Sequence, residues 1–207
     1  MIKDKPVQGF LDELASKSST PGGGSVAAIM GAMGAALVSM VANLTVGKKN
    51  YEEVDAEMQD LLARSEQLRE QLTAMIKADV DVFGQVMEAY GMPKESDEEK
   101  AARSMTIQST LKAATDAPLE CAKLCADIIL LCKPMAEKGN TNVTSDAGVA
   151  VLAANAALRS AALNVYINIS GIKDENFVND RRKQTEALLD ANSQLTEEIY
   201  DLVKSKL

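Results

Sequence analysis

The sequence contains no histidine, so any acid or base in a site must be an Asp, Glu, Lys, Tyr or Cys side chain. Asp79 is the first candidate, because it lies on the apolar stripe of a long amphipathic pattern, between Ile76 and Phe83, whereas Asp81 points elsewhere. A carboxylate on an apolar face costs free energy unless it is paired or used. We therefore expect Asp79 either to transfer protons in a site or to pair with a Lys or Arg of a neighbouring helix.

Asp146 is the second candidate carboxylate. It follows Thr144 and Ser145 in the first turn of a predicted helix, where the positive end of the helix dipole favours a negative charge. A helix cap is the simpler interpretation of this position, and a catalytic role is the alternative.

A glycine-rich turn joins Pro21 to Ser25 through Gly22, Gly23 and Gly24. Glycines remove every Cβ atom, so the backbone N–H groups can approach a ligand, and Ser25 can cap the helix that follows. The alternative is a loop whose glycines only let two helices pack closely. The turn is neither a Walker loop nor a dinucleotide fingerprint, because no Gly-Lys-Ser/Thr follows and no strand pattern precedes it.

Several cations and amides could bind a polar ligand. Lys48 and Lys49 follow the predicted central helix, where they could receive a carboxylate or simply complement the helix dipole. Amides in or beside apolar helices must be satisfied by hydrogen bonds, either between helices or to a ligand. These amides are Asn140, Asn142, Asn164 and Asn168, of which the last two share one helix face.

We expect no metal site. Cys121 and Cys125 share a helix face and Cys132 follows, but without histidine a zinc ion would need further carboxylate ligands that the pattern does not identify. Buried, reduced cysteines of the core are the better interpretation.

Size and charge predict one domain spanning residues 1–207 with no nucleic-acid partner. The length is enough for one full hydrophobic core, and a net charge of −8 opposes binding to phosphate backbones. The segment Met1–Pro6 lacks the apolar core of a signal peptide, so we expect a cytoplasmic protein. The uncharged run Val26–Val46 is rich in Ala, Gly and Met and only weakly hydrophobic, which favours the central helix of a bundle over a membrane span.

Hydrophobic periodicity predicts an all-α, single-domain helical bundle with long central helices. Strand signals are absent, since apolar and polar residues never alternate and aromatic residues make up only 3% of the chain. Start and stop signals give about seven helices. Their expected ranges are 7–16, 25–44, 51–90, 96–115, 118–133, 144–169 and 174–204.

The combined motifs resemble the cyclodeaminase domain of the formiminotransferase-cyclodeaminase family, which includes free-standing methenyltetrahydrofolate cyclohydrolases. The resemblance covers almost the whole chain, and its strength lies in the order and spacing of seven motifs. They are Pro21 to Ala28, Met33 to Leu37, Gly47-Lys48-Lys49, Asp79 with Phe83, Met92-Pro93-Lys94, Gly139-Asn140 followed by Ser145-Asp146, and Asn164-Val165 with Asn168.

The resemblance implies a helical homodimer, a tetrahydrofolate substrate that carries a one-carbon bridge, and no further cofactor. Either a formimino group closes with loss of ammonia to give the methenyl cation, or that cation takes water and opens to the formyl compound. In the site that this chemistry implies, Asp79 and Asp146 are the catalytic carboxylates. The residues expected to hold the pterin or the glutamate tail are Gly22, Gly23, Gly24, Ser25, Lys48, Lys49, Asn140, Ser145 and Asn168.

Between the two activities we favour the cyclohydrolase, because no formiminotransferase domain accompanies this chain to make the formimino substrate. The cyclodeaminase remains the alternative. A rival of another class is a non-catalytic scaffold that uses its small-residue helices only to dimerise, and a rise in melting temperature on adding a folate would argue against it.

Overall fold

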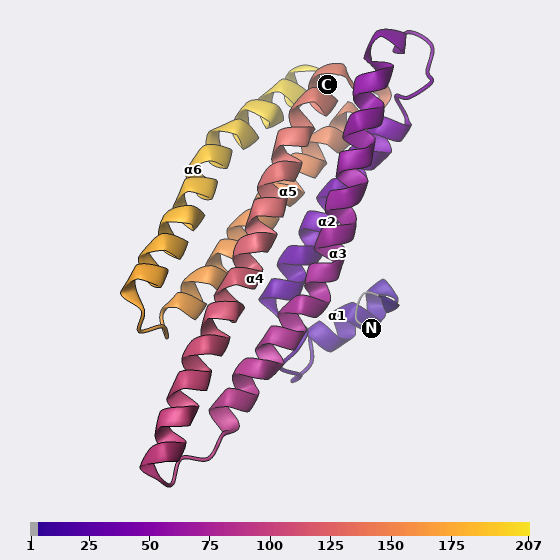
Figure 1. Ribbon diagram of the computed structural model, residues 1–207. Helices are drawn as coiled ribbons and strands as arrows, with labels where there is room; N and C mark the ends of the chain where they lie inside the picture. Colours follow the sequence, from indigo (N-terminus) through magenta and orange to yellow (C-terminus); the bar gives the residue numbers. More distant parts are fainter. Residues whose placement is uncertain (1–3) are drawn as a thin grey trace.

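The computed structural model describes residues 4–207, which form six α-helices and no strand (Figure 1). The all-α prediction is therefore confirmed for this part of the chain. Of the segment Met1–Pro6, the first three residues lie outside the described range. The helices are α1 (Val7–Leu14), α2 (Gly23–Asn43), α3 (Asp55–Gly91), α4 (Asp97–Lys138), α5 (Thr144–Ile169) and α6 (Glu175–Ser205), with short 3-10 helices at η2 (Glu52–Val54) and η3 (Thr141–Val143).

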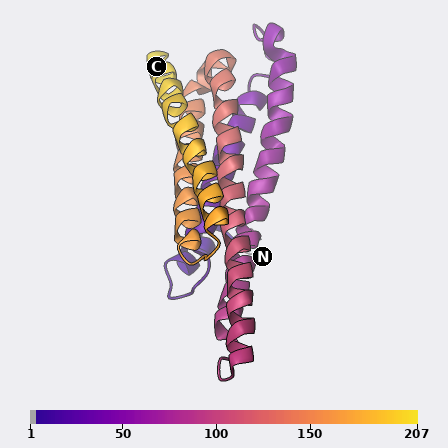
Figure 2. The same cartoon turned by 60° about the vertical axis from the view of Figure 1, so that its left-hand side comes forward.

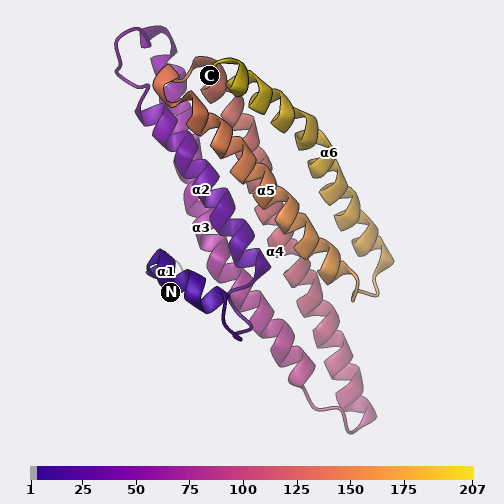
Figure 3. The ribbon, with the colours of Figure 1, turned by 180° about the vertical axis from the view of Figure 1, so that it is seen from behind.

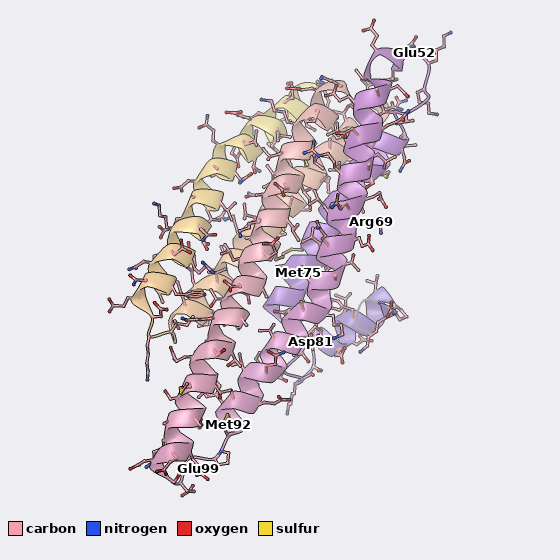
Figure 4. The ribbon with its side chains drawn as sticks, viewed as in Figure 1. Glu52, Arg69, Met75, Asp81, Met92 and Glu99 are labelled. Atoms are coloured by element: carbon pink, nitrogen blue, oxygen red, sulfur yellow. The ribbon has the colours of Figure 1, made fainter. Side chains whose placement is uncertain are left out.

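Helices α2 to α6 run up and down in turn and pack side by side. Seen from behind, α2 and α5 lie next to each other on one face of the bundle, with α3 and α4 beneath them (Figure 3). The end of α3 and the start of α4 project beyond the other helices as a two-helix arm, which Figure 2 shows from a second side. Met92 and Glu99 mark the tip of this arm, and Glu52 marks the opposite end of the molecule (Figure 4).

Small residues let α2 pack closely on its neighbours α3, α4 and α5. A Cβ atom on Gly34 would lie 3.1 Å from the carbonyl oxygen of Ala150 on α5, and one on Gly31 would lie 2.9 Å from the sulfur of Cys125 on α4. Backbones this close bring many atoms into van der Waals contact, and the side chains of Ala27 and Ala35 are fully buried. Helix α2 therefore packs closely on α3, α4 and α5, while the side that carries Met33 is exposed.

The expectation of about seven helices is wrong by one, because residues 97–138 form a single helix that passes through Pro118 and Pro134. Proline usually ends a helix, since it lacks the N–H that bonds to the carbonyl four residues earlier. For Pro118 that carbonyl belongs to Ala114, and it accepts a hydrogen bond of 2.6 Å from the side chain of Asn168 instead. For Pro134 it belongs to Leu130, which lies at the surface.

The three cysteines are buried and unpaired, as expected. Burial raises the pKa of the Cys132 thiol, and a hydrogen bond with Cys121 together with burial raises that of Cys125, so the thiols keep their protons. Within residues 4–207 no three Cys, Asp or Glu side chains are grouped to hold a metal ion.

Two segments are long and apolar enough to cross a membrane by length and composition. They are Gly23–Asn43, with a mean hydropathy of 1.9, and Thr141–Ile169, with a mean hydropathy of 1.3. About half of each is buried inside the bundle, at 56% and 50%, as in the core helices of soluble proteins. The large apolar side chains that these two segments expose are Met33, Val149, Leu152, Leu163 and Ile167.

The close contact between α2 and α5 generates a stability prediction. Gly34→Leu should lower the free energy of unfolding by about 1 to 3 kcal/mol, because the added atoms collide with backbone atoms that cannot move aside. Gly84→Ala is the matched control: a Cβ there meets nothing within 4 Å, so it should add about 0.5 to 1 kcal/mol through helix propensity. Urea unfolding of both variants measures this, and equal effects would contradict the packing argument.

Candidate active site

A cleft of about 310 Å³ opens where the first turn of α2 meets α3, α4 and the last turns of α5. Its walls combine aliphatic and aromatic side chains with a few polar groups, the composition usual for a small-molecule site. Among its lining residues Asp79 is the only charged one. The lining comprises Ser19, Thr20, Gly22, Gly23, Gly24, Asp79, Val82, Phe83, Val86, Ala114, Ala117, Pro118, Asn164, Ile167 and Asn168.

The carboxylate of Asp79 is half-buried and oriented by one hydrogen bond, in which the hydroxyl of Ser25 donates to Oδ2 over 2.9 Å. Within the described residues no Lys or Arg forms an ion pair with it, and the neighbouring Lys77 pairs with Asp81 instead. Asp79 is therefore not half of an ion pair between helices. Its charge faces the cleft, which leaves the functional interpretation in place.

Gly24 allows Asp79 to come so close to α2. A Cβ atom on Gly24 would lie 2.0 Å from Oδ1 of Asp79, so no other residue fits without moving the carboxylate. Helix α2 begins at Gly23 with Gly22 as its N-cap, which makes the first N–H groups of α2 free of partners within the helix. The carboxylate thus lies beside the positive end of the α2 dipole.

The expectation that Ser25 caps this helix is wrong. The helix starts two residues earlier, at Gly23, and the N-cap makes no side-chain hydrogen bond. The serine hydroxyl instead orients Asp79, which is fifty-four positions further along the chain. Local sequence cannot reveal such a partner.

Two amides line the opposite wall. The side-chain NH₂ of Asn168 donates to the carbonyl of Ala114 on α4 over 2.6 Å, and that of Asn164 donates to the carbonyl of Ser160 over 2.9 Å. Because each NH₂ group is bound to a backbone carbonyl, each Oδ1 oxygen remains to accept a hydrogen bond from a ligand. Phe83 lines the same cleft from α3 and is 38% exposed.

The other predicted site residues lie at the far end of α2. Helix α2 has 21 residues, which places Lys48 and Lys49 about 30 Å from the cleft of the same chain. Glu52, labelled in Figure 4, marks that end of the molecule, whereas Asp79 lies on α3 between the labelled Met75 and Asp81. Asp146 and Ser145 begin α5 at the same far end.

Asn140 belongs to the loop at that far end. Its NH₂ group donates to the carbonyl of Leu44, its backbone N–H donates to Thr45, and its Oδ1 accepts from the N–H of Asn142. These bonds fasten the start of η3 to the end of α2. One chain therefore brings Gly22 to Ser25, Asp79 and Asn168 together, but not the residues of the far end.

Most of the apolar lining residues were not among the predicted site residues, and neither were Asn164 and Pro118. Asn164 could have been found, since it lies one turn before Asn168 on the same face. Pro118 could not, because as a local signal it indicates the start of a helix, whereas it lines the cleft in the middle of α4.

The family of this chain follows from its similarity to known proteins. The model of the formiminotransferase-cyclodeaminase family matches residues 6–187. The chain belongs to this family. The resemblance that the motifs indicated is thereby confirmed, and the family relationship covers all helices up to the middle of α6.

Three relatives illustrate the range of the family. A methenyltetrahydrofolate cyclohydrolase of Methylorubrum extorquens is 57% identical over 207 residues, the whole of both chains. A formimidoyltransferase-cyclodeaminase of Mus musculus is 33% identical over 188 residues, which cover 91% of this chain and 35% of that protein. The crystal structure of a formiminotetrahydrofolate cyclodeaminase from Thermotoga maritima superposes with a TM-score of 0.83 at 33% identity, covering 100% and 98% of the two chains.

The contact between Gly24 and Asp79 yields a prediction at this site. Gly24→Ala should displace the carboxylate and lower turnover of methenyltetrahydrofolate by at least about tenfold, since small misplacements of a reacting group are costly. Gly84→Ala on α3, outside the cleft lining, is the control, because a Cβ there meets nothing within 4 Å and should leave turnover within about twofold. If both variants lose the same activity, the glycines matter through the backbone and not through Asp79.

Proposed function

We propose that this protein is a methenyltetrahydrofolate cyclohydrolase, which adds water to 5,10-methenyltetrahydrofolate and releases 10-formyltetrahydrofolate. One observation carries the proposal: a relative of that name matches the whole chain at 57% identity. The cleft supports it, because a single carboxylate on apolar walls suits a cationic substrate. No cofactor beyond the folate is needed, since the hydrolysis involves no redox step.

Asp79 is the residue that we assign to proton transfer. A water molecule attacks the bridging carbon between N5 and N10, and the carboxylate of Asp79 takes one of its protons. The resulting carbinolamine then opens: the bond from carbon to N5 breaks, the hydroxyl oxygen becomes the formyl oxygen, and its proton ends on N5. The balance is cation plus water giving neutral formyl compound plus one proton.

The remaining groups of the cleft stabilise this path. The free N–H groups of the first turn of α2 border the cleft, and such preorganised donors stabilise the carbinolamine oxygen as it gives up its proton and becomes the formyl oxygen. The acceptor oxygens of Asn164 and Asn168 suit the N–H groups of a pterin, and Phe83 offers a flat apolar surface. Ser25 keeps the carboxylate pointing at the reacting carbon.

Formiminotetrahydrofolate cyclodeaminase is the second candidate, and the Thermotoga maritima structure with its TM-score of 0.83 favours it specifically. Both reactions pass through one tetrahedral carbon between two nitrogens, so the same carboxylate could serve either. The discriminating measurement follows each substrate separately by the absorbance of the methenyl compound, which falls on hydrolysis and rises on deamination.

Asp79→Asn tests the proposal directly. Turnover should fall by about 100-fold or more, the usual loss when a positioned acid or base is removed. The melting temperature should hold, because the amide is nearly isosteric and no ion pair is broken. Loss of melting temperature with activity retained would assign Asp79 a structural role and make Asp146 the leading carboxylate.

We further propose that the protein is a homodimer, with the exposed face of α2 and α5 as its interface. This α2–α5 face is apolar along its whole length, and the one charged side chain among its exposed residues on α5 is Arg159. A monomer rarely leaves so continuous an apolar surface in water. Its large exposed side chains are Met33, Val149, Leu152, Leu163 and Ile167.

Within residues 4–207, helix α1 is only loosely packed on the other helices. None of its residues is buried, and Val7 and Leu11, one turn apart, are 77% and 48% exposed. A second copy that covers the α2–α5 face would reach this helix as well, because α1 lies beside the start of α2 (Figure 3). Burial of these faces removes any need for a membrane, and we propose a soluble, cytoplasmic protein.

The dimer offers a reason why Lys48 and Lys49 belong to the site. Among the described residues that line the cleft, none is a cation for the carboxylates of the glutamate tail. Ile167 belongs both to the cleft and to the α2–α5 face, so a second copy on that face borders the cleft. A two-fold axis across α2 makes the two copies of α2 antiparallel, which carries the far end of one chain toward the cleft of the other.

A mixing experiment tests this arrangement. Light scattering should give about twice 22.1 kDa, and Lys49→Ala should raise KM more than it lowers kcat, because a tail contact is made in ground and transition states alike. In a mixed dimer of Lys49→Ala and Asp79→Asn chains, one cleft combines both intact residues, so activity with the original KM should reappear. Absence of this recovery, or an active monomer, would contradict a shared site.

A further inference from the structure

We propose that Pro118 is a positioning residue: it locks the side-chain amide of Asn168 so that the cleft presents a hydrogen-bond acceptor, selecting ligands with an N–H group at that point. The inference rests on the proposed function for the identity of the ligand, a reduced pterin. The fixed orientation of the Asn168 amide is inferred from the helix geometry alone.

The first step is the missing donor in α4. Pro118 lies in the interior of this helix of 42 residues and has no N–H, so the carbonyl of Ala114 loses its usual partner within the helix. A buried carbonyl without a donor costs free energy, commonly about 1 to 3 kcal/mol. The NH₂ group of Asn168 provides the donor across the interface between α4 and α5, at 2.6 Å.

The second step concerns the other half of the amide. A carbonyl can only accept, so the group that faces Ala114 must be the NH₂, and the flipped amide would set two oxygens against each other. The Oδ1 atom of Asn168 is therefore directed away from Ala114, in a side chain that lines the cleft. Pro118 lines the same cleft, so the proline that leaves the carbonyl of Ala114 without a helical donor lies beside the ligand.

Asn164 is the second amide on this wall, and no proline-freed carbonyl fixes the orientation of its side chain. Its NH₂ group donates to the carbonyl of Ser160, four residues earlier on the same helix, which already has its own helical donor. That carbonyl gains nothing essential from Asn164, so this amide can turn at little cost. Of the two amides on this wall, Asn168 is the one whose polarity the fold fixes.

The ligand consequence follows from the chemistry of the reduced pterin. Its ring carries N–H and amino donors on the edge away from the one-carbon bridge, and a fixed acceptor pairs with them. An analogue with an acceptor there leaves two lone pairs facing each other and is rejected, because specificity from unpaired polar groups is strong. Pro118 thus selects the ligand without contacting the reacting atoms.

The test is Pro118→Ala, which returns an N–H to Ala114 and makes the Asn168 bond dispensable. The dissociation constant of 5-formyltetrahydrofolate, measured by calorimetry, should rise roughly 5- to 10-fold, the worth of one oriented hydrogen bond. The side-chain amide protons of Asn168, followed by NMR, should exchange faster with water. Pro134→Ala, the second proline of α4, is the matched control and should change neither quantity.

A double variant separates positioning from stability. In the Asn168→Ala background, Pro118→Ala should add no further loss of affinity, whereas independent effects would multiply. The proposal is overturned if amide exchange at Asn168 is unchanged in Pro118→Ala, or if it rises while affinity stays the same. Failure of the proposed function would show differently, as wild-type protein that turns over neither folate substrate while the amide exchange still responds to Pro118→Ala.

Discussion

The close approach of Asp79 to the first turn of α2 is the constraint on which the rest of the site depends. The carboxylate occupies the space that a Cβ on residue 24 would need, and the hydroxyl of Ser25 binds its second oxygen. Such proximity requires the side chain of Asp79 to pack directly on the backbone of α2, which the glycine at position 24 permits. The same requirement continues along α2, where Gly31 and Gly34 admit α4 and α5. The close packing of α2 therefore forms both the site and the core.

The sequence predicted well those features that repeat within one helix. Periodicity placed α5 and α6 within a residue of their bounds, and it identified Asp79 as the polar exception on an apolar stripe. It failed where the deciding partner is remote in the chain. Pro118 does not end α4, because Asn168, fifty-four positions away from Ala114, satisfies the carbonyl that proline leaves open. Likewise, the hydroxyl of Ser25 donates to a carboxylate on another helix and does not cap its own helix.

The order of motifs in the sequence also does not show how far a helix separates them in space. Lys48 and Lys49 follow α2 directly, yet the 21 residues of that helix separate them from the cleft by about 30 Å. A cleft whose only charge is an acid cannot by itself hold a polyanionic tail. The apolar α2–α5 face offers a physical link between these facts, since a partner on that face borders the cleft at Ile167. Dimerisation through this face would then also complete the substrate-binding site.

The chemistry of the family explains why one such cleft suffices without histidine, metal ligands or a catalytic pair. A methenyl cation is already electrophilic, so in the proposed mechanism the protein has only to accept a proton and hold the ring, and we assign the first task to Asp79 and the second to the amides and Phe83. Hydrolysis and deamination share their tetrahedral carbon and differ in the group that leaves. The carboxylate therefore cannot discriminate between them. Discrimination falls to the groups that fix the ring relative to Asp79, and among the described residues the amide of Asn168, held by the carbonyl that Pro118 frees, is the one whose orientation the backbone itself dictates.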